Sequence, residues 1–205
     1  MNINLSSTIH DLKNSLARIM ECSDQPSNEE IETIRNIART ACSTLTSLLQ
    51  IEYLRENTLI LNKEYLDIDS FMRDVYVDAK PYCKHPFHLT GATPEQLFMI
   101  DRLLITQVLI NAVQNADRYT NTEISISYRL SNDGNLEIDV IDDGPGFPDS
   151  MIFGDNGKVD GGWNGIALGR EIVSRHGGEL CLHNKSGGIF SLKLSGLCCI
   201  NSIKS

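Results

Sequence analysis

The chain contains 205 residues, of which 41% are hydrophobic and 22% are charged, a composition typical of globular proteins. Its formal net charge of −9 at pH 7 argues against nucleic acid and anionic membranes as partners. No apolar run approaches the roughly 18 residues of a transmembrane helix, and the first residues lack the pattern of a signal peptide. We therefore expect a cytoplasmic protein with one domain of average size and a smaller one.

Two stripes of apolar residues predict a helical hairpin at the start of the chain. Within residues 3–21 and 28–56, apolar positions recur at spacings that alternate between three and four. Ser27 and Glu30 have the arrangement of a capping box for the second helix. Such a hairpin needs a further surface to cover its stripe, which favours a homodimer with a four-helix bundle. Packing of the hairpin on the rest of its own chain is the alternative.

The rest of the chain alternates between strand-like and helix-like patterns. We expect strands at residues 65–68, 87–90, 124–130, 136–140, 180–183 and 189–194, and helices at residues 70–80, 101–118 and 166–176. The pair Asp133-Gly134 predicts a hairpin between two of these strands. Helices against one face of a mixed sheet form an α/β sandwich.

His10 lies beside the apolar stripe of the first predicted helix and is followed by Asp11. An imidazole next to a carboxylate can act as a nucleophile, because one ring nitrogen attacks while the carboxylate orients or deprotonates the other. A histidine on the flank of a helix is more often a solvated surface residue. Both interpretations remain open from the residues alone.

Asn111 and Asn115 are four residues apart and therefore share one face of the helix predicted at residues 101–118. Their amide oxygens suit Mg²⁺, which prefers oxygen ligands and takes few from the protein when phosphates supply the rest. Caps on neighbouring loops are the alternative role for these two side chains. Arg118 and Tyr119 follow at the end of the same helix.

Asp142 directly follows a predicted strand, with Gly144 and Gly146 in the turn behind it. A carboxylate in this position could accept a hydrogen bond from an exocyclic amine such as that of adenine, although an acidic surface turn has the same composition. Residues 160–165 then form a glycine-rich stretch that opens a helix. Such a stretch can hold phosphate through free backbone N–H groups, or it can be a simple surface loop.

In their order along the chain, these four patterns resemble the motifs of a two-component sensor histidine kinase. Residues 10–14 look like the H box, residues 111–120 like the N box, residues 142–146 like the G1 box and residues 161–165 like a G2 box. The resemblance covers almost the whole chain and implies an α+β protein. A dimerisation and phosphotransfer hairpin would occupy residues 1–57, and an ATP-binding domain of the GHKL or Bergerat type would occupy residues 65–200.

The resemblance implies a soluble, ATP-dependent protein histidine kinase with His10 as the phosphoacceptor. Asp11 would orient and activate His10, and Asn14 would position water for phosphatase activity. The phosphoryl group would pass to an aspartate in the receiver domain of a response regulator. Because His10 lies near the start of the sequence, the input signal would come from a separate sensor protein.

The resemblance also implies a site for ATP and Mg²⁺. Asn115, together with Asn111, would hold the Mg²⁺ that bridges the phosphates, while Asp142 would recognise the adenine amine. Arg118 would contact phosphate, and the glycines would shape the pocket and its lid. The implied nucleotide-binding residues are Asn111, Asn115, Arg118, Tyr119, Asp142, Gly144, Gly146, Gly161 and Gly165.

Three features depart from the family pattern. Ser15 replaces a common proline, Trp163 falls in the proposed lid, and the segment at residues 148–161 is short for an ATP lid. These features keep two alternatives open. One is a histidine phosphotransferase with a degenerate ATP-binding domain, and the other is a GHKL regulator that sequesters a partner protein.

Overall fold

The computed structural model describes residues 27, 31, 33, 34, 37, 41, 61–93, 97–152, 164–195 and 197–198. The chain divides into two compact units, Met1–Ile60 and Leu61–Ser205. No helix among the described residues is long and apolar enough to cross a membrane.

In the first unit, the described residues from 31 to 41 are helical, as their apolar spacing predicts. The Ile31 N–H donates to the Ser27 carbonyl oxygen at 2.9 Å. This bond joins residues four apart, which is the hydrogen-bond spacing of an α-helix. The remainder of the predicted hairpin lies outside the described residues, and so do His10, Asp11 and Asn14.

The second unit contains the helices and strands of an α+β domain. Its strands are β1 (Glu64–Asp67), β2 (Phe87–Gly91), β3 (Leu97–Ile100), β4 (Ile124–Leu130), β5 (Leu136–Asp142), β6 (Glu179–Asn184), β7 (Gly188–Leu194) and β8 (Leu197–Cys198). Its helices are α3 (Ile68–Ala79), α4 (Arg102–Tyr119), α5 (Asp149–Ile152) and α6 (Asn164–Arg175), with a short 3-10 helix η1 (Lys80–Tyr82).

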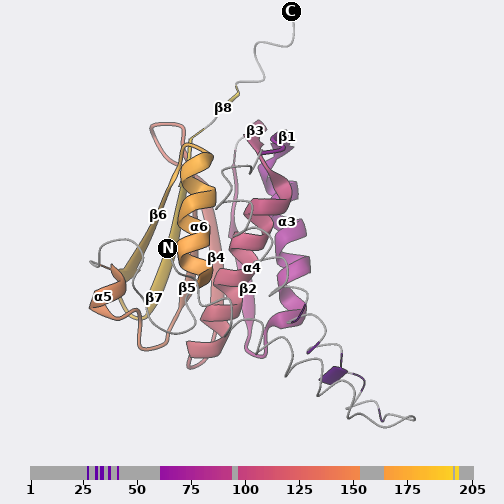
Figure 1. The fold of residues 1–205 in the computed structure, drawn as a ribbon, viewed down its shortest axis with the longest axis vertical. Coiled ribbons are helices and arrows are strands. Elements are labelled where there is room, and N and C mark those ends of the chain that lie inside the picture. Colours follow the sequence, from indigo (N-terminus) through magenta and orange to yellow (C-terminus); the bar gives the residue numbers. More distant parts are fainter. Residues whose placement is uncertain are drawn as a thin grey trace, which may run out of the picture. The chain divides into compact units, whose positions relative to one another are not determined.

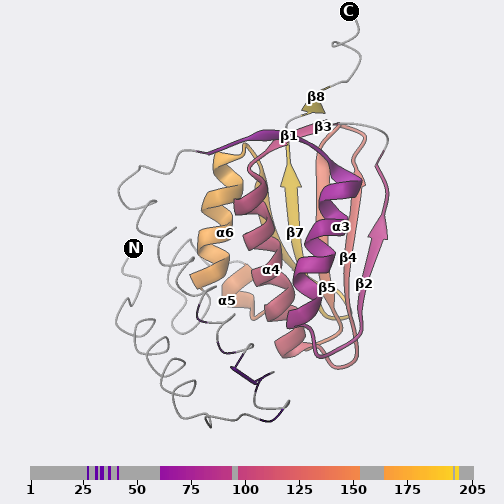
Figure 2. The same cartoon turned by 90° about the vertical axis from the view of Figure 1, so that its right-hand side faces the viewer.

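Five strands form the main sheet in the order β2-β4-β5-β7-β6. The β2–β4 pair is parallel and the other pairs are antiparallel, so the sheet is mixed, as predicted. A smaller antiparallel sheet has the order β1-β3-β8. Figures 1 and 2 show α3, α4 and α6 side by side on one face of the main sheet.

The core lies between that face and the helices. Alternate strand residues are buried, and one apolar row crosses four strands through Tyr128, Ile138, Leu192 and Leu180. The opposite face carries polar side chains such as Asp139, which accepts a hydrogen bond from a serine hydroxyl on β7. Because the side-chain period of a strand is two, this alternation fixes the register of the sheet.

Aspartates cap two of the helices and correct two predicted boundaries. The Asp67 carboxylate accepts from Ser70 N at 2.8 Å, so α3 begins at Ile68, which the sequence assigned to the preceding strand. The Asp101 carboxylate accepts from Leu104 N at 3.1 Å and starts α4 in the same way. Side-chain capping of this kind satisfies amide groups that the first helical turn leaves unpaired.

A buried histidine links the end of α6 to the start of α4. His176 is 4% exposed, and its Nε2 accepts the Asp101 N–H at 3.0 Å. Its Nδ1 lies 2.7 Å from the Ile172 carbonyl oxygen. Since a carbonyl oxygen can only accept, Nδ1 carries the proton and the ring is neutral. Burial holds the pKa of His176 below its ordinary value.

Candidate nucleotide-binding site

A pocket lies between the C-terminal half of α4 and the ends of β5 and β7. Its walls are mostly apolar and include a small number of polar side chains, as in most small-molecule sites. The structure brings four predicted site residues together here, namely Asn115, Tyr119, Asp142 and Gly146. The complete lining is Ala112, Asn115, Ala116, Tyr119, Val140, Asp142, Gly146, Phe147, Ile166 and Phe190.

Asp142 is the last residue of β5, and two backbone amides fix its carboxylate. Its Oδ1 accepts from Gly144 N at 2.8 Å and from Gly188 N at 3.3 Å. Both donors point at the same oxygen, and Oδ2 forms no hydrogen bond with any of the described residues. The side chain is therefore held in one orientation at the pocket wall, where a donor such as an exocyclic amine can reach it.

The turn after Asp142 depends on two glycines. A Cβ atom at Gly144 would lie 2.2 Å from the Tyr119 carbonyl oxygen, so only glycine permits this approach to α4. Gly146 has a φ of 77°, in the left-handed region that glycine adopts freely. Beyond it, the Asn184 side chain pairs with both backbone polar groups of Phe147, at 2.8 Å and 2.7 Å. The last strand residue of β6 thereby holds Phe147 in the pocket wall.

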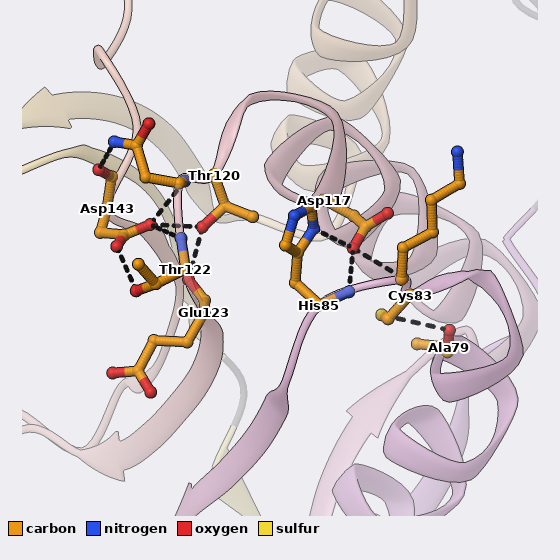
Figure 3. Close-up of polar contacts among 10 residues, drawn as sticks. Ala79, Cys83, His85, Asp117, Thr120, Thr122, Glu123 and Asp143 are labelled. Atoms are coloured by element: carbon orange, nitrogen blue, oxygen red, sulfur yellow. Dashed lines mark hydrogen bonds and ion pairs between the residues drawn. The ribbon is translucent and has the colours of Figure 1, made fainter.

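Asp143 joins the same turn to the loop that follows α4, as Figure 3 shows. Its carboxylate accepts from the hydroxyls of Thr120 and Thr122, each with Oγ1 at 2.5 Å, and from the backbone amides of Asn121 and Thr122. The hydroxyl of Thr120, then that of Thr122 and the loop amides, hold the pKa of the Asp143 carboxyl well below its usual range. Asp143 is therefore an anion that ties two segments of the domain together.

A second aspartate, which belongs to α4 itself, connects this helix to the loop before β2; it is also drawn in Figure 3. Asp117 is 8% exposed, and its Oδ1 accepts from Lys84 N at 2.9 Å and from His85 N at 3.0 Å. The Nδ1 of His85 lies 3.1 Å from the same oxygen. This carboxylate fastens the loop before β2 to α4.

Other predicted site residues lie elsewhere. Among the described residues, Asn111 and Arg118 are outside the pocket lining. The Asn111 Oδ1 accepts from Gln107 Nε2 at 3.0 Å, and Arg118 is exposed in the last turn of α4. Gly165 belongs to the first turn of α6. Gly161 and Trp163 lie outside the described residues.

Asp143 lies inside the glycine turn predicted at residues 142–146, although no role was predicted for it, and neither Phe147 nor Asn184 was predicted as part of this region. Phe147 directly follows that turn, so its position in the sequence was a usable signal. Asn184 comes from a strand near the end of the chain, and only the pairing of β6 with β7 brings it to the turn. No local pattern could have identified it.

Comparisons with known proteins agree with this architecture. Residues 100–196 match the family described as histidine kinase-, DNA gyrase B-, and HSP90-like ATPase. The sensor protein KdpD of Escherichia coli is 26% identical over 91% of this chain and 23% of its own length. This chain spans less than half the length of such curated relatives.

Solved structures of histidine kinases share the fold. Acinetobacter baumannii histidine kinase AdeS has a TM-score of 0.67 at 22% identity, over 94% of this chain and 97% of that chain. Histidine kinase ThkA, solved in complex with the response regulator protein TrrA, has a TM-score of 0.60 at 21% identity, over 93% of this chain and 58% of that chain.

These matches and the fold define a histidine kinase-like, ATP-binding catalytic domain at residues 100–196. The chain that carries it is homologous to the sensor histidine kinases of two-component signal transduction.

Proposed function

We propose that this protein is an ATP-dependent protein histidine kinase that phosphorylates its own His10. The phosphoryl group would then pass to an aspartate of a response regulator receiver domain. The observation that carries the proposal is the single pocket shared by Asn115 and Asp142 in a domain of this ATP-binding family. The solved complex of the fold relative ThkA with a response regulator supports a partner of that class.

The two halves of the pocket suit the two ends of ATP. At one end, the Oδ2 of Asp142 would accept a hydrogen bond from the adenine amine, and Val140 and Phe190, which line the pocket, would cover the base. At the other end, Asn115 in the pocket wall would hold Mg²⁺ together with Asn111, which lies one turn earlier on α4 and outside the lining, and the ion would neutralise charge on the phosphates. The donor set fits this ion, because amide oxygens are among the oxygen ligands that Mg²⁺ prefers.

His10 would supply the nucleophile for phosphoryl transfer. One ring nitrogen would form a bond to the γ-phosphorus as the bond to the bridging oxygen breaks and ADP leaves. Asp11 would hold the proton on the other nitrogen, and Asn14 would position water when the phosphoryl group is later removed. The apolar stripes of residues 1–57 would bring two chains together as a homodimer, with a four-helix bundle at the interface.

Incubation with radiolabelled Mg-ATP tests the proposal. We expect the protein to label itself through a bond that is stable in alkali and labile in acid, as a phosphoramidate is. His10→Gln should abolish the label, while the matched variant His183→Gln, at an exposed histidine of β6, should retain it. Label that persists on His10→Gln would show that another residue accepts the phosphoryl group.

The same experiment separates the alternative functions. A histidine phosphotransferase would not label itself with Mg-ATP but would accept phosphate from a phosphorylated receiver domain. A regulator that sequesters a partner would do neither.

A further inference from the structure

The polar side chains of the pocket come from two of its elements, α4 and β5, which are distant in the sequence. Asn115 and Tyr119 come from α4, whereas Asp142 is the last residue of β5. The strand β4 and the turn between β4 and β5 separate the two elements in the sequence. A ligand that spans the pocket must contact both elements at once. Its affinity therefore depends on how firmly the end of α4 is held against the end of β5.

Asp143 makes that connection. Its carboxylate Oδ1 accepts from Thr120 Oγ1 at 2.5 Å, Asn121 N at 2.8 Å and Thr122 N at 3.0 Å. Its Oδ2 accepts from Thr122 Oγ1 at 2.5 Å, and its backbone carbonyl accepts from Asn121 Nδ2 at 2.6 Å. Figure 3 shows these contacts converging on one side chain. Hydrogen bonds to an ionised carboxylate are stronger than those between neutral groups.

The connected residues adjoin two residues of the pocket. Thr120 directly follows Tyr119, and Asp143 directly follows Asp142. The close approach of Gly144 to the Tyr119 carbonyl oxygen lies at the same junction. Asp143 itself is outside the pocket lining given by the described residues. Its effect on a ligand must therefore act through its neighbours.

We propose that Asp143 is a positioning residue for the nucleotide. It holds the carboxylate of Asp142, which recognises the base, at a fixed distance from the helix that carries Asn115. The inference rests on the proposed function, because it assigns adenine to Asp142 and the phosphates with their metal to α4. A ligand that contacts both elements should depend on Asp143. A ligand that contacts only the base end should not.

Calorimetric titration of Asp143→Asn with Mg-ATP and with adenosine tests this. The variant keeps the shape of the side chain but points an amide donor at groups that are themselves donors, so the loop loses part of its anchor. We expect Mg-ATP to bind about tenfold more weakly and adenosine to bind with an affinity within about twofold of the wild type. A general loss of folded protein would lower both affinities by the same factor.

Two further variants complete the experiment. Asp139→Asn removes a carboxylate from β5, the strand that ends at Asp142, on the polar face of the sheet, and it should leave both affinities unchanged. Thr122→Val removes one hydrogen-bond donor to Asp143 at an exposed position, so we expect the chain to remain folded. It should change the ratio of the Mg-ATP and adenosine affinities by about threefold, in the same direction as Asp143→Asn does.

An unchanged ratio in both Asp143→Asn and Thr122→Val overturns the inference. A wild type that binds neither ligand instead overturns the proposed function, and the inference with it. The two failures are thus distinguished by the wild-type titration alone.

Discussion

Acidification should destabilise this domain through His176. The folded state requires a neutral ring, because its Nε2 accepts the Asp101 N–H at 3.0 Å and a proton there would face that donor. Burial lowers the pKa of this histidine, and the hydrogen bond to the Ile172 carbonyl raises it. The positive charge of Lys63 lowers the pKa slightly and the negative charge of Asp101 raises it slightly. The unfolded chain binds the proton more readily than the folded chain does. Stability is therefore complete above the unfolded pKa and declines as the pH falls below it.

The size of the effect follows from linkage. If the pKa of His176 in the unfolded chain is about 6.5, the free energy of unfolding falls by about 1.4 kcal/mol per pH unit below that value. This decline ends at the lowered pKa of His176 in the folded state. Urea unfolding at about pH 7.5 and about pH 5.5 should show this loss in the wild type, on top of contributions from other groups. His176→Gln removes the titrating ring and serves as the reference. The difference in unfolding free energy between the two proteins should shrink over this interval, by at most about 1.4 kcal/mol.

Parallel pH profiles for the wild type and His176→Gln would refute this reasoning. They would mean that the ring binds a proton as easily in the folded protein as in the unfolded chain. The tautomer assigned from the Ile172 and Asp101 contacts would then be wrong.

Three other perturbations have defined outcomes. Asp142→Ala should weaken ATP binding by about 5- to 150-fold, because a polar atom of the base loses its hydrogen-bond partner. The control Asp139→Ala should bind ATP as the wild type does. Equal affinities of the wild type and both variants, measured by calorimetry, would exclude the adenine contact. Gly144→Ala should lower the free energy of unfolding by about 1–3 kcal/mol in urea titrations, because its Cβ would meet the Tyr119 carbonyl oxygen at 2.2 Å. Light scattering at micromolar concentration should give the mass of two chains, and the mass of one chain would contradict the bundle.

Much of the fold could be predicted because its periodicities are strong. β4 and β5 alternate buried and partly exposed residues along their length, and α4 buries one face, so burial and pattern agree. β3 and α5, each with 4 residues, were missed; β1 is equally short but was predicted at residues 65–68. β8, with 2 residues, has no pattern of its own and exists only through its pairing with β3.

The candidate site was predictable where its chemistry is local in the sequence. Asp142 and Asn115 fall in recognisable patterns, and the structure places both in one pocket. The contacts that hold them were not predictable, because Asp143 reaches a loop about twenty residues earlier and Asn184 arrives from β6. The bond between Gln107 and Asn111 is another example, since spacing alone does not reveal which of two neighbours an amide will face.

The parallel pairing of β2 with β4 has a consequence for the order in which the chain is made. Phe87 of β2 pairs with Ile124 of β4, and β3 and α4 lie between these two strands in the sequence. β2 therefore leaves the ribosome well before its partner strand has been made. An unpaired strand in a nascent chain is open to wrong partners. Tyr76 of α3 offers an early local contact, because its ring stacks on that of Phe87 at 4.8 Å and its hydroxyl donates to the Phe87 carbonyl oxygen. The helix made just before β2 can therefore shelter this strand until β4 emerges.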